Sequence, residues 1–162
     1  MDSNADSMPG IFLTLEGDDG VGKSTQADLL ASWLEQQGRT VLRVHEPGGT
    51  RLGEKIRALL LDKEDDAMAP LAELLLFEAA RAQVMDEVIE PALARGEVVV
   101  CDRFTDSTLA YQGYGRELGV GLVRSTNDLA CGGRYPDRTL LLALDPDVAR
   151  NRVEGRSTDG TG

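Results

Sequence analysis

The chain has 162 residues, enough for one domain with its own core, and 41% of its residues are hydrophobic. Its formal net charge of −11 argues against broad binding to DNA or RNA, which needs a basic surface. No apolar run approaches the ~20 residues of a membrane span, and residues 1–9 lack the basic end and apolar stretch of a signal peptide.

In chain order, residues 1–9 predict a short disordered tail and residues 10–162 a single domain. Four short runs then predict β-strands, at residues 11–16, 40–44, 98–101 and 139–144. These runs are rich in β-branched residues or leucine and lack polar alternation, a pattern typical of strands buried on both faces of a parallel sheet.

Helical patterns lie between these strands. Residues 23–37 place alanine and leucine on one face and end at Gly38, a favourable residue after a helix C-terminus. Further helices are predicted over residues 54–61, over residues 118–130, and over residues 70–94 with a kink or a restart at Pro91.

The alternation of strands and helices predicts βαβ units and a doubly wound α/β fold. In such folds ligands bind beyond the carboxyl ends of the strands. The most chemically suggestive segments follow three predicted strands, at residues 17–24, 45–51 and 102–103. The sequence therefore predicts a ligand site at that edge of the sheet.

A phosphate-binding motif, G-x-x-x-x-G-K-[ST], is formed by Gly17, Gly22, Lys23 and Ser24 between a predicted strand and a predicted helix. Glycines let successive N–H groups turn toward phosphate oxygens, and the helix N-terminus adds a positive dipole end. Lys23 is expected to reach the β- and γ-phosphates and the Ser24 hydroxyl to hold Mg²⁺. The predicted phosphate-binding residues are Gly17, Asp18, Asp19, Gly20, Val21, Gly22, Lys23, Ser24 and Thr25.

The motif alone indicates a nucleoside triphosphate, and neighbouring residues narrow the class. A guanine-reading Asn-Lys-x-Asp, expected in a switch GTPase, is absent from the sequence. Motor ATPases favour Asp-Glu at a strand end, but here Arg103 follows Asp102. An Asp-Arg pair suits a second anionic phosphate and favours a kinase.

The sequence resembles bacterial thymidylate kinases, which transfer the γ-phosphate of ATP to dTMP to give dTDP. The resemblance spans about residues 11–155 and implies a three-layer P-loop nucleoside-monophosphate-kinase fold. It is carried by four segments in the family's order: residues 16–25, Glu46-Pro47-Gly48-Gly49-Thr50, Phe77-Glu78-Ala79-Ala80-Arg81, and Asp102-Arg103 with the run Ser107 to Gly113.

The resemblance assigns a dTMP pocket whose side chains suit those roles. Phe77 and Arg81 lie four residues apart, on one helix face, so a ring can stack on the base while a guanidinium donates to a thymine carbonyl. Core packing is the alternative for Phe77. Tyr111 is expected either against the sugar or as a buried structural residue. The residues predicted to contact dTMP are Asp19, Pro47, Phe77, Arg81, Arg103, Thr108, Tyr111 and Gln112.

Catalysis is expected to rest on positioning and charge stabilisation, without a covalent intermediate. The resemblance places Asp19 near the acceptor 3′-hydroxyl or the metal, while Asp102 with Ser24 is predicted to hold Mg²⁺. Arg103 is expected to bind the dTMP phosphate in a bidentate contact. The predicted catalytic residues are Lys23, Asp19, Arg103 and Arg156.

Two departures from the family pattern bear on charge. His45 stands where many relatives have Arg, and it either faces the pocket or ends a strand; Arg51 and Arg57 are possible phosphate contacts in its place. The phosphate loop contains no Arg, so the charge-stabilising role passes to a lid segment with Arg150, Arg152 and Arg156, for which a solvated helix face is the alternative.

The third departure is that the sequence ends inside that lid, so the family's last strand and closing helices are expected to be missing and residues 139–144 to form an exposed apolar edge. Two alternatives to an active thymidylate kinase therefore stay open: a nucleotide-binding fragment without turnover, and a kinase for another nucleoside monophosphate. The resemblance implies a homodimer. Only two cysteines, Cys101 and Cys131, and no export signal indicate the cytoplasm.

Overall fold

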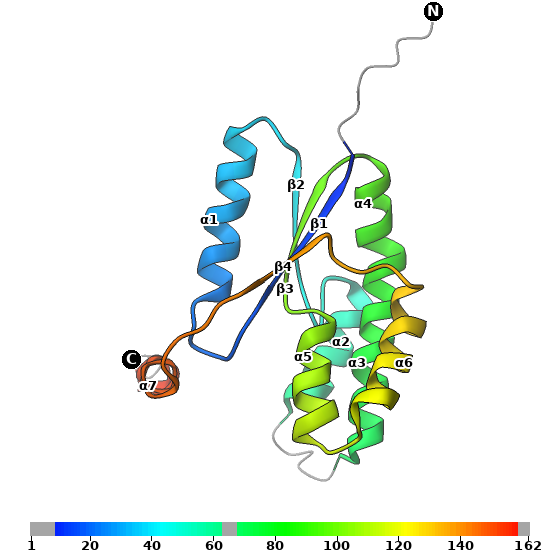
Figure 1. Ribbon diagram of the computed structural model, residues 1–162, viewed down its shortest axis with the longest axis vertical. Helices are drawn as coiled ribbons and strands as arrows, with labels where there is room; N and C mark the ends of the chain where they lie inside the picture. The colour runs from blue at the N-terminus through cyan, green and yellow to red at the C-terminus, as the bar shows by residue number, and fades with distance from the viewer. Residues whose placement is uncertain (1–8, 63–67, 159–162) are drawn as a thin grey trace, which may run out of the picture.

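The computed structural model describes residues 9–62 and 68–158, and for residues 156–158 the backbone alone. Its centre is a four-stranded sheet in the order β2-β3-β1-β4, with every neighbouring pair parallel (Figure 1). The strands are β1 (Ile11–Glu16), β2 (Val41–His45), β3 (Val98–Asp102) and β4 (Arg138–Leu141). The α/β fold and all four predicted strands are confirmed, with ends that differ by three residues at most.

Both faces of β3 are buried, as the lack of polar alternation predicted. Val99 and Cys101 pack into a core with Phe12 on one side of the sheet, whereas Val98 and Val100 join a second core on the other side. Helix α1 (Lys23–Gln36) covers this second face, and the other helices, apart from α7, lie on the first (Figure 1). The molecule thus has three layers.

Helix α1 ends as predicted, with Gly38 in the left-handed region at φ 81° just beyond it. Helix α2 (Arg51–Leu61) begins three residues before its predicted start because the Thr50 side chain accepts a hydrogen bond from the Gly53 N–H and caps the first turn. Helix α6 (Val120–Cys131) agrees with its prediction within two residues.

The long helix predicted over residues 70–94 is continuous but not uniform. Helix α3 (Pro70–Val84) passes into a π-helical segment, η2 (Met85–Ile89), and then into α4 (Glu90–Ala94). Pro91 lies in the first turn of α4 and has no N–H to donate. The irregularity expected at Pro91 therefore occurs one turn earlier, where the π-type bonding absorbs it.

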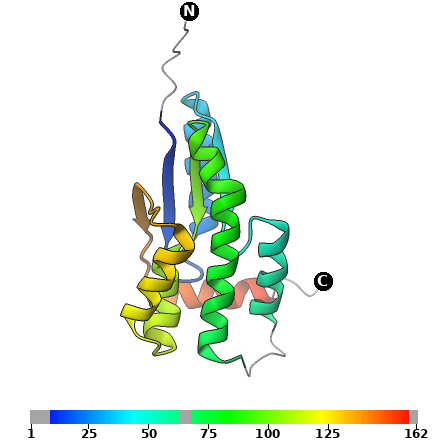
Figure 2. The same ribbon diagram turned by 90° about the vertical axis from the view of Figure 1, so that its right-hand side faces the viewer.

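Two helical regions were not predicted as elements. Helix α5 (Thr105–Thr108) and the π-helical segment η3 (Leu109–Gly115) follow β3 directly, and α7 (Pro146–Thr158) ends the described chain. Figure 2 shows α7 crossing beneath the carboxyl ends of the strands, beside the phosphate loop. Both regions therefore lie at the edge of the sheet where ligands are expected.

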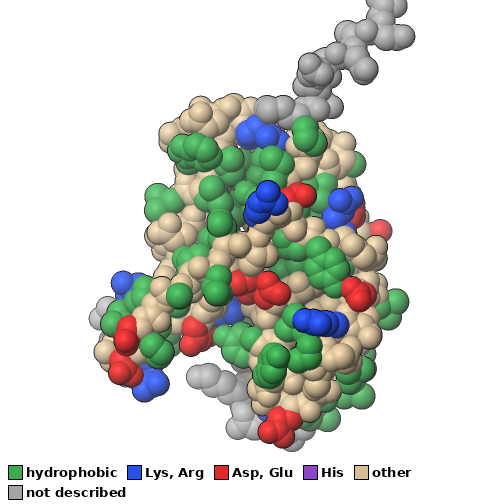
Figure 3. Space-filling model, in the orientation of Figure 1, with side chains coloured by type: hydrophobic (Ala, Val, Ile, Leu, Met, Phe, Trp, Pro, Cys, Tyr) green, Lys and Arg blue, Asp and Glu red, His purple; other side chains and the backbone are tan. Residues whose placement is uncertain are grey.

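Strand β4 forms one edge of the sheet, and all its residues are exposed, including Leu140 and Leu141. On the side of the molecule shown in Figure 3, hydrophobic side chains gather between α1 and α4. The predicted apolar edge is confirmed. The tail predicted at residues 1–9 and the chain end at residues 159–162 lie outside the described residues, apart from Pro9, whose carbonyl accepts a hydrogen bond from Arg39. Within the described part of the chain, no helix has the length and apolarity to cross a membrane.

Candidate active site

The phosphate loop runs from β1 to α1 through backbone conformations that favour glycine. Gly17, Gly20 and Gly22 have φ values of 143°, 81° and 96°. Gly22 is the N-cap of α1, and a Cβ built on it would meet nothing within 4 Å. Open space at a helix N-terminus, beside a turn of glycines, is the arrangement that admits an anion.

Lys23 is buried inside this loop and fixed by it. Its Nζ donates to the carbonyl oxygens of Gly17 and Asp18 at 3.0 and 2.8 Å, and lies 3.9 Å from Asp19 Oδ1. Burial lowers the pKa of Lys23, and the nearby Arg103 guanidinium lowers it further. The ammonium group is thus held at the mouth of the loop, ready for a phosphate.

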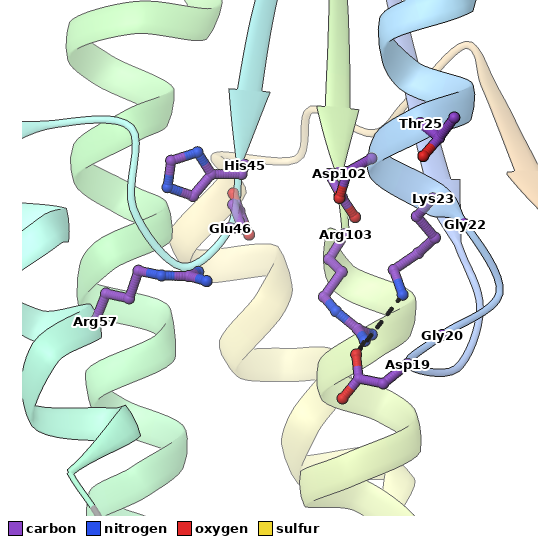
Figure 4. A pocket seen from close by; sticks show the side chains of 11 residues that line it. Asp19, Gly20, Gly22, Lys23, Thr25, His45, Glu46, Arg57, Asp102 and Arg103 are labelled. Atoms are coloured by element: carbon purple, nitrogen blue, oxygen red, sulfur yellow. Dashed lines mark hydrogen bonds and ion pairs between the residues drawn. The ribbon is translucent and has the colours of Figure 1, made fainter. Parts of the chain in front are cut away.

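Two cations neutralise the negative charge of Asp19. This charge would otherwise repel a phosphate bound beside it. Asp19 Oδ1 accepts a hydrogen bond from Arg103 Nη2 at 2.5 Å and faces Lys23 (Figure 4). Arg103 has a positive φ of 70° and also donates to Gly17 O and to Ser107 Oγ. Arg103 therefore joins the loop to the helix that follows β3.

Most residues of the predicted phosphate loop line one polar cavity of about 200 Å³. Gly17, Asp18 and Val21 do not: Gly17 and Asp18 offer carbonyls to Lys23, and Val21 is buried. The loop residues that line the cavity are Asp19, Gly20, Gly22, Lys23, Ser24 and Thr25.

Ser24 and Asp102, the predicted magnesium ligands, meet at this cavity. Ser24 Oγ donates to Asp102 Oδ2 at 2.8 Å, and Asp102 Oδ1 is buried without a partner among the described residues. A carboxylate oxygen with spare acceptor capacity beside a hydroxyl fits a hard cation and its water ligands. The described residues hold no cluster of three or more metal-ligating side chains, so an ion here would depend on the nucleotide and water for most of its ligands.

A second cavity, of about 610 Å³, adjoins the first and shares Asp19, Glu46, Arg57 and Arg103 with it. Its size suits a nucleotide, since small-molecule sites usually enclose about 300–1,000 Å³. All residues predicted to contact dTMP line this cavity, from the loop, the segment after β2, helix α3 and the region after β3: Asp19, Pro47, Phe77, Arg81, Arg103, Thr108, Tyr111 and Gln112.

Arg81, one of these side chains, is almost fully buried, with 2% of its surface exposed. Its Nε donates to Glu46 Oε2 at 2.8 Å, and its Nη1 donates to the side-chain oxygens of Glu78, Thr108 and Asn127. Among the described residues Nη2 has no acceptor, so this nitrogen is available to a ligand in the cavity.

Glu46 sits where the two cavities meet, and its environment is unusual. Burial raises the pKa of Glu46 to about 7, although Arg81 lowers it. Its second oxygen, Oε1, has no hydrogen-bond partner among the described residues. No individual role was predicted for this residue from the sequence, because its partner Arg81 lies 35 positions away.

The positions of two aromatic residues bear on the alternatives left open for them. Phe77 is half-buried, lines the second cavity and lies outside the hydrophobic core. Tyr111 is 44% exposed, so it is not a buried structural residue; its ring lies 5.4 Å from the Arg103 guanidinium. Both rings therefore offer surface to a ligand in that cavity.

Gln112 is held by a residue that sequence reasoning missed. Its Nε2 donates to Glu73 Oε1 at 2.5 Å, and Glu73 Oε2 accepts from Arg116 Nη2 at 2.6 Å. Glu73 lies in the first turn of α3, and all three residues line the second cavity. Only the Gln112–Arg116 spacing of one helical turn is visible in the sequence.

Glu16 is a second missed residue, at the end of β1. Its Oε1 accepts from the N–H groups of Phe104 and Ser107, and its Oε2 accepts from Ser107 Oγ at 2.6 Å. Helix α5 has no side-chain cap of its own, so Glu16 satisfies N–H groups at its start. Burial raises the pKa of Glu16.

The basic residues after β2 divide between the two cavities and the surface. His45 both ends β2 and lines the phosphate cavity, with its Nε2 3.0 Å from Glu54 Oε1. Arg57 lines both cavities and donates to Pro47 O at 2.8 Å. Arg51 starts α2 and lines neither cavity.

Helix α7 carries the lid arginines and touches the phosphate loop. A Cβ on Gly20 would lie 2.3 Å from Ala149 O, and Arg152 Nη1 is 3.5 Å from Gly20 O. Arg150 pairs with Asp147 at 3.7 Å. Arg156 lies in the same helix, but its side chain is outside the described part of the structure.

A glycine loop that holds a buried lysine, joined to a nucleotide-sized cavity lined by arginines, defines the class of P-loop kinases that act on small phosphorylated substrates. The family model for thymidylate kinase matches residues 15–161. The chain belongs to the thymidylate kinase family.

Individual relatives agree with this assignment. The chain is 56% identical to a thymidylate kinase of Synechococcus sp. (strain JA-3-3Ab), over 88% of this chain and 70% of that protein. It is 53% identical to one of Bifidobacterium longum (strain DJO10A), over 91% of this chain and 73% of that protein. The crystal structure of thymidylate kinase from Ehrlichia chaffeensis superposes with a TM-score of 0.80 at 40% identity, covering 93% of this chain and 86% of that chain.

Proposed function

We propose that the chain is a thymidylate kinase that transfers the γ-phosphate of ATP to dTMP and yields dTDP and ADP. The observation that carries the proposal is the junction of the two cavities. A phosphate loop with its lysine forms one, a base-sized cavity forms the other, and Asp19 and Arg103 line both. Two nucleotides bound there would bring their phosphates together.

In the proposed reaction an oxygen of the dTMP phosphate attacks the γ-phosphorus of ATP, and the bond from that phosphorus to the β–γ bridging oxygen breaks. Lys23 and Arg103 neutralise charge on the phosphates, while the amides of the loop bind their oxygens. Asp19, by pairing with both cations, keeps each at the junction. The protein's contribution is positioning and charge stabilisation.

Mg²⁺ is the proposed cofactor, held through Ser24 and Asp102. When bound with ATP, the ion supplies neutralisation of phosphate charge. Asp102 Oδ1, which lacks a partner in the described structure, would accept a hydrogen bond from a water of the ion. Arg152 and Arg156 of α7 are the proposed further cations over the phosphates, since α7 packs against Gly20.

In the dTMP cavity we assign Phe77 to stacking on the base, Arg81 to the thymine O4, and Gln112 to the base edge. Tyr111 lies against the sugar, and Arg103 binds the 5′-phosphate. Thr108 and Pro47 complete the wall. The homodimer, the lack of a nucleic-acid partner and the cytoplasmic location stay predictions.

The test is an ADP-coupled assay of the chain with ATP, Mg²⁺ and dTMP. Lys23→Ala removes the ammonium group from the loop, so turnover is expected to fall at least about 100-fold. Circular dichroism of the variant should match that of the parent chain, because among the described residues the hydrogen bonds of the Lys23 ammonium go to loop carbonyls and its ion pair is with Asp19.

Equal turnover by both proteins would refute the proposed function. If the parent chain binds ATP and dTMP in calorimetry but makes no dTDP, it is a nucleotide-binding fragment and not an active kinase.

A further inference from the structure

The orientation of the Gln112 amide is fixed by chemistry. Glu73 Oε1 lies 2.5 Å from Gln112 Nε2, and a carboxylate can only accept hydrogen bonds. The amide nitrogen must therefore face Glu73. A flipped amide would place two oxygens in contact, which is repulsive.

The carboxylate that fixes this amide is itself held. Glu73 Oε2 accepts from Arg116 Nη2 at 2.6 Å, and the Glu73 side chain is 13% exposed. Each oxygen of Glu73 thus has its own donor, one from Gln112 and one from Arg116. Both partners anchor the carboxylate, and the contact with Arg116 is a charge-assisted hydrogen bond.

With Nε2 engaged, Gln112 has only Oε1 left for a ligand in the cavity. This oxygen has no donor among the described residues, and Gln112 lines the cavity. Arg81 lines the same cavity, its Nη2 has no acceptor among the described residues, and a guanidinium can only donate. Arg81 and Gln112 therefore present a fixed donor and a fixed acceptor to this cavity.

We infer that Glu73, braced by Arg116, is a specificity-determining residue that selects pyrimidine nucleotides with a protonated N3 by turning the Gln112 oxygen toward the base. The inference rests on the proposed function and adds the group that sets base choice. Thymine and uracil carry an acceptor at O4 next to the N3–H donor, which matches Arg81 and Gln112. Cytosine carries a donor at N4 next to an acceptor at N3, so both contacts are lost.

Glu73 is a positioning residue, since it acts through Gln112. In Glu73→Gln the neighbour of Gln112 can donate as well as accept, so the Gln112 amide can turn either way. Calorimetric dissociation constants for dTMP, dUMP and dCMP measure the result on the full chain. Discrimination against dCMP, relative to dTMP, is expected to fall about tenfold, because one buried contact is no longer enforced.

Two affinity ratios read together, dCMP to dTMP and dUMP to dTMP, separate positioning from a general loosening of the cavity. Both dUMP and dTMP carry N3–H and O4, so Glu73→Gln should change the second ratio by less than about twofold. A merely structural role would weaken all three nucleotides alike and leave discrimination against dCMP unchanged.

The chain offers a matched control. Gln83 Nε2 donates to Glu87 Oε1 at 2.5 Å in the same amide–carboxylate contact, on the exposed surface and outside the two cavities. Glu87→Gln is expected to leave all three affinities unchanged. If it reduced discrimination as Glu73→Gln does, the inference would be overturned.

A second variant guards against a folding defect in the first. Glu73→Lys with Arg116→Glu keeps an ion pair between α3 and the end of η3 but offers only a donor to Gln112. The amide oxygen should then turn toward the introduced ammonium group, and discrimination against dCMP should fall further than in Glu73→Gln.

The outcomes separate the two proposals. If the parent chain does not bind dTMP, the proposed function fails, and the inference that rests on it fails with it. If the parent chain prefers dTMP but both Glu73 variants, folded by circular dichroism, keep full discrimination against dCMP, the inference alone is overturned.

Discussion

At the scale of single residues, the cluster around Arg81 places one guanidinium between two buried carboxylates. Glu46 and Glu78 both contact Arg81, and Glu46 is 4% exposed. Such a cluster carries more negative than positive charge when both acids are ionised. Because burial removes water from both carboxylates, it raises the pKa of both acids, for Glu46 to about 7.

This shift makes folding stability depend on pH. Between about pH 4.5 and pH 7 the folded state keeps a proton on Glu46 that the unfolded state has released. Stability should therefore fall as pH rises through this range, by about 3 kcal/mol from Glu46, and level off above it. Urea unfolding without nucleotide, from pH 4.5 to pH 8, measures the effect.

Glu46→Gln is the control for this pH dependence. The introduced amide cannot titrate, so the decline should become shallower by the Glu46 share, while Glu16 and Glu78, whose pKa values are also raised, keep theirs. Parallel curves for the two proteins would contradict the assigned pKa of Glu46.

The phosphate loop could be predicted from the sequence because its residues are contiguous and each glycine answers a local backbone need, as Gly22 does at φ 96°. The dTMP-site residues came from the family resemblance, and the structure brings them into one cavity. Glu73 and Glu16 escaped prediction because their partners lie 39 and 91 positions away. Their roles depend on tertiary contacts and leave no local pattern.

At the scale of elements, the helical region after β3 carries much of the second cavity: Thr108 in α5, and Tyr111 and Gln112 in η3. Sequence reasoning missed it as an element because it is short and irregular, with no apolar periodicity to detect. The strands were found because their composition reflects burial on both faces. Glu16 of β1, which lies outside this region, fixes the position of its first turn through hydrogen bonds.

Glu16→Ala should therefore damage stability and binding together. The change leaves the Phe104 N–H, the Ser107 N–H and the Ser107 hydroxyl without this acceptor, at a cost of about 3 kcal/mol in urea unfolding. The affinity for dTMP should fall more than that for ATP, because α5 and η3 line the second cavity, the proposed dTMP site.

Ser107→Ala is the milder comparison. It removes the hydroxyl but keeps both backbone N–H groups on Glu16, so about 1 kcal/mol is expected. Equal losses in the two variants would show that Glu16 does not act as the cap of α5.

At the scale of the whole molecule, α3 and α6, which lie across the sheet from α1 (Figure 1), carry exposed leucines. Leu71 and Leu75 lie one turn apart on α3, and Leu122 and Leu129 lie two turns apart on α6; each is at least 44% exposed. The two helices pack against each other on the same layer (Figure 2). Exposed leucines on two helices that pack together suit the proposed homodimer.

Leu75→Glu tests the proposed dimer, because the new carboxylate would be buried without a partner in a two-fold interface. Association should weaken roughly 100-fold or more, and sedimentation should change from twice the 17.4 kDa chain mass to the single chain. Leu29→Glu is the matched control: Leu29 is 58% exposed, but on α1, across the sheet. If the parent chain sediments as a monomer, or Leu29→Glu alone dissociates it, the α3–α6 face is not the interface. A dimer lost only in Leu75→Glu would place the interface on the layer that carries Glu73 and Phe77, so that subunit contact and base cavity share α3.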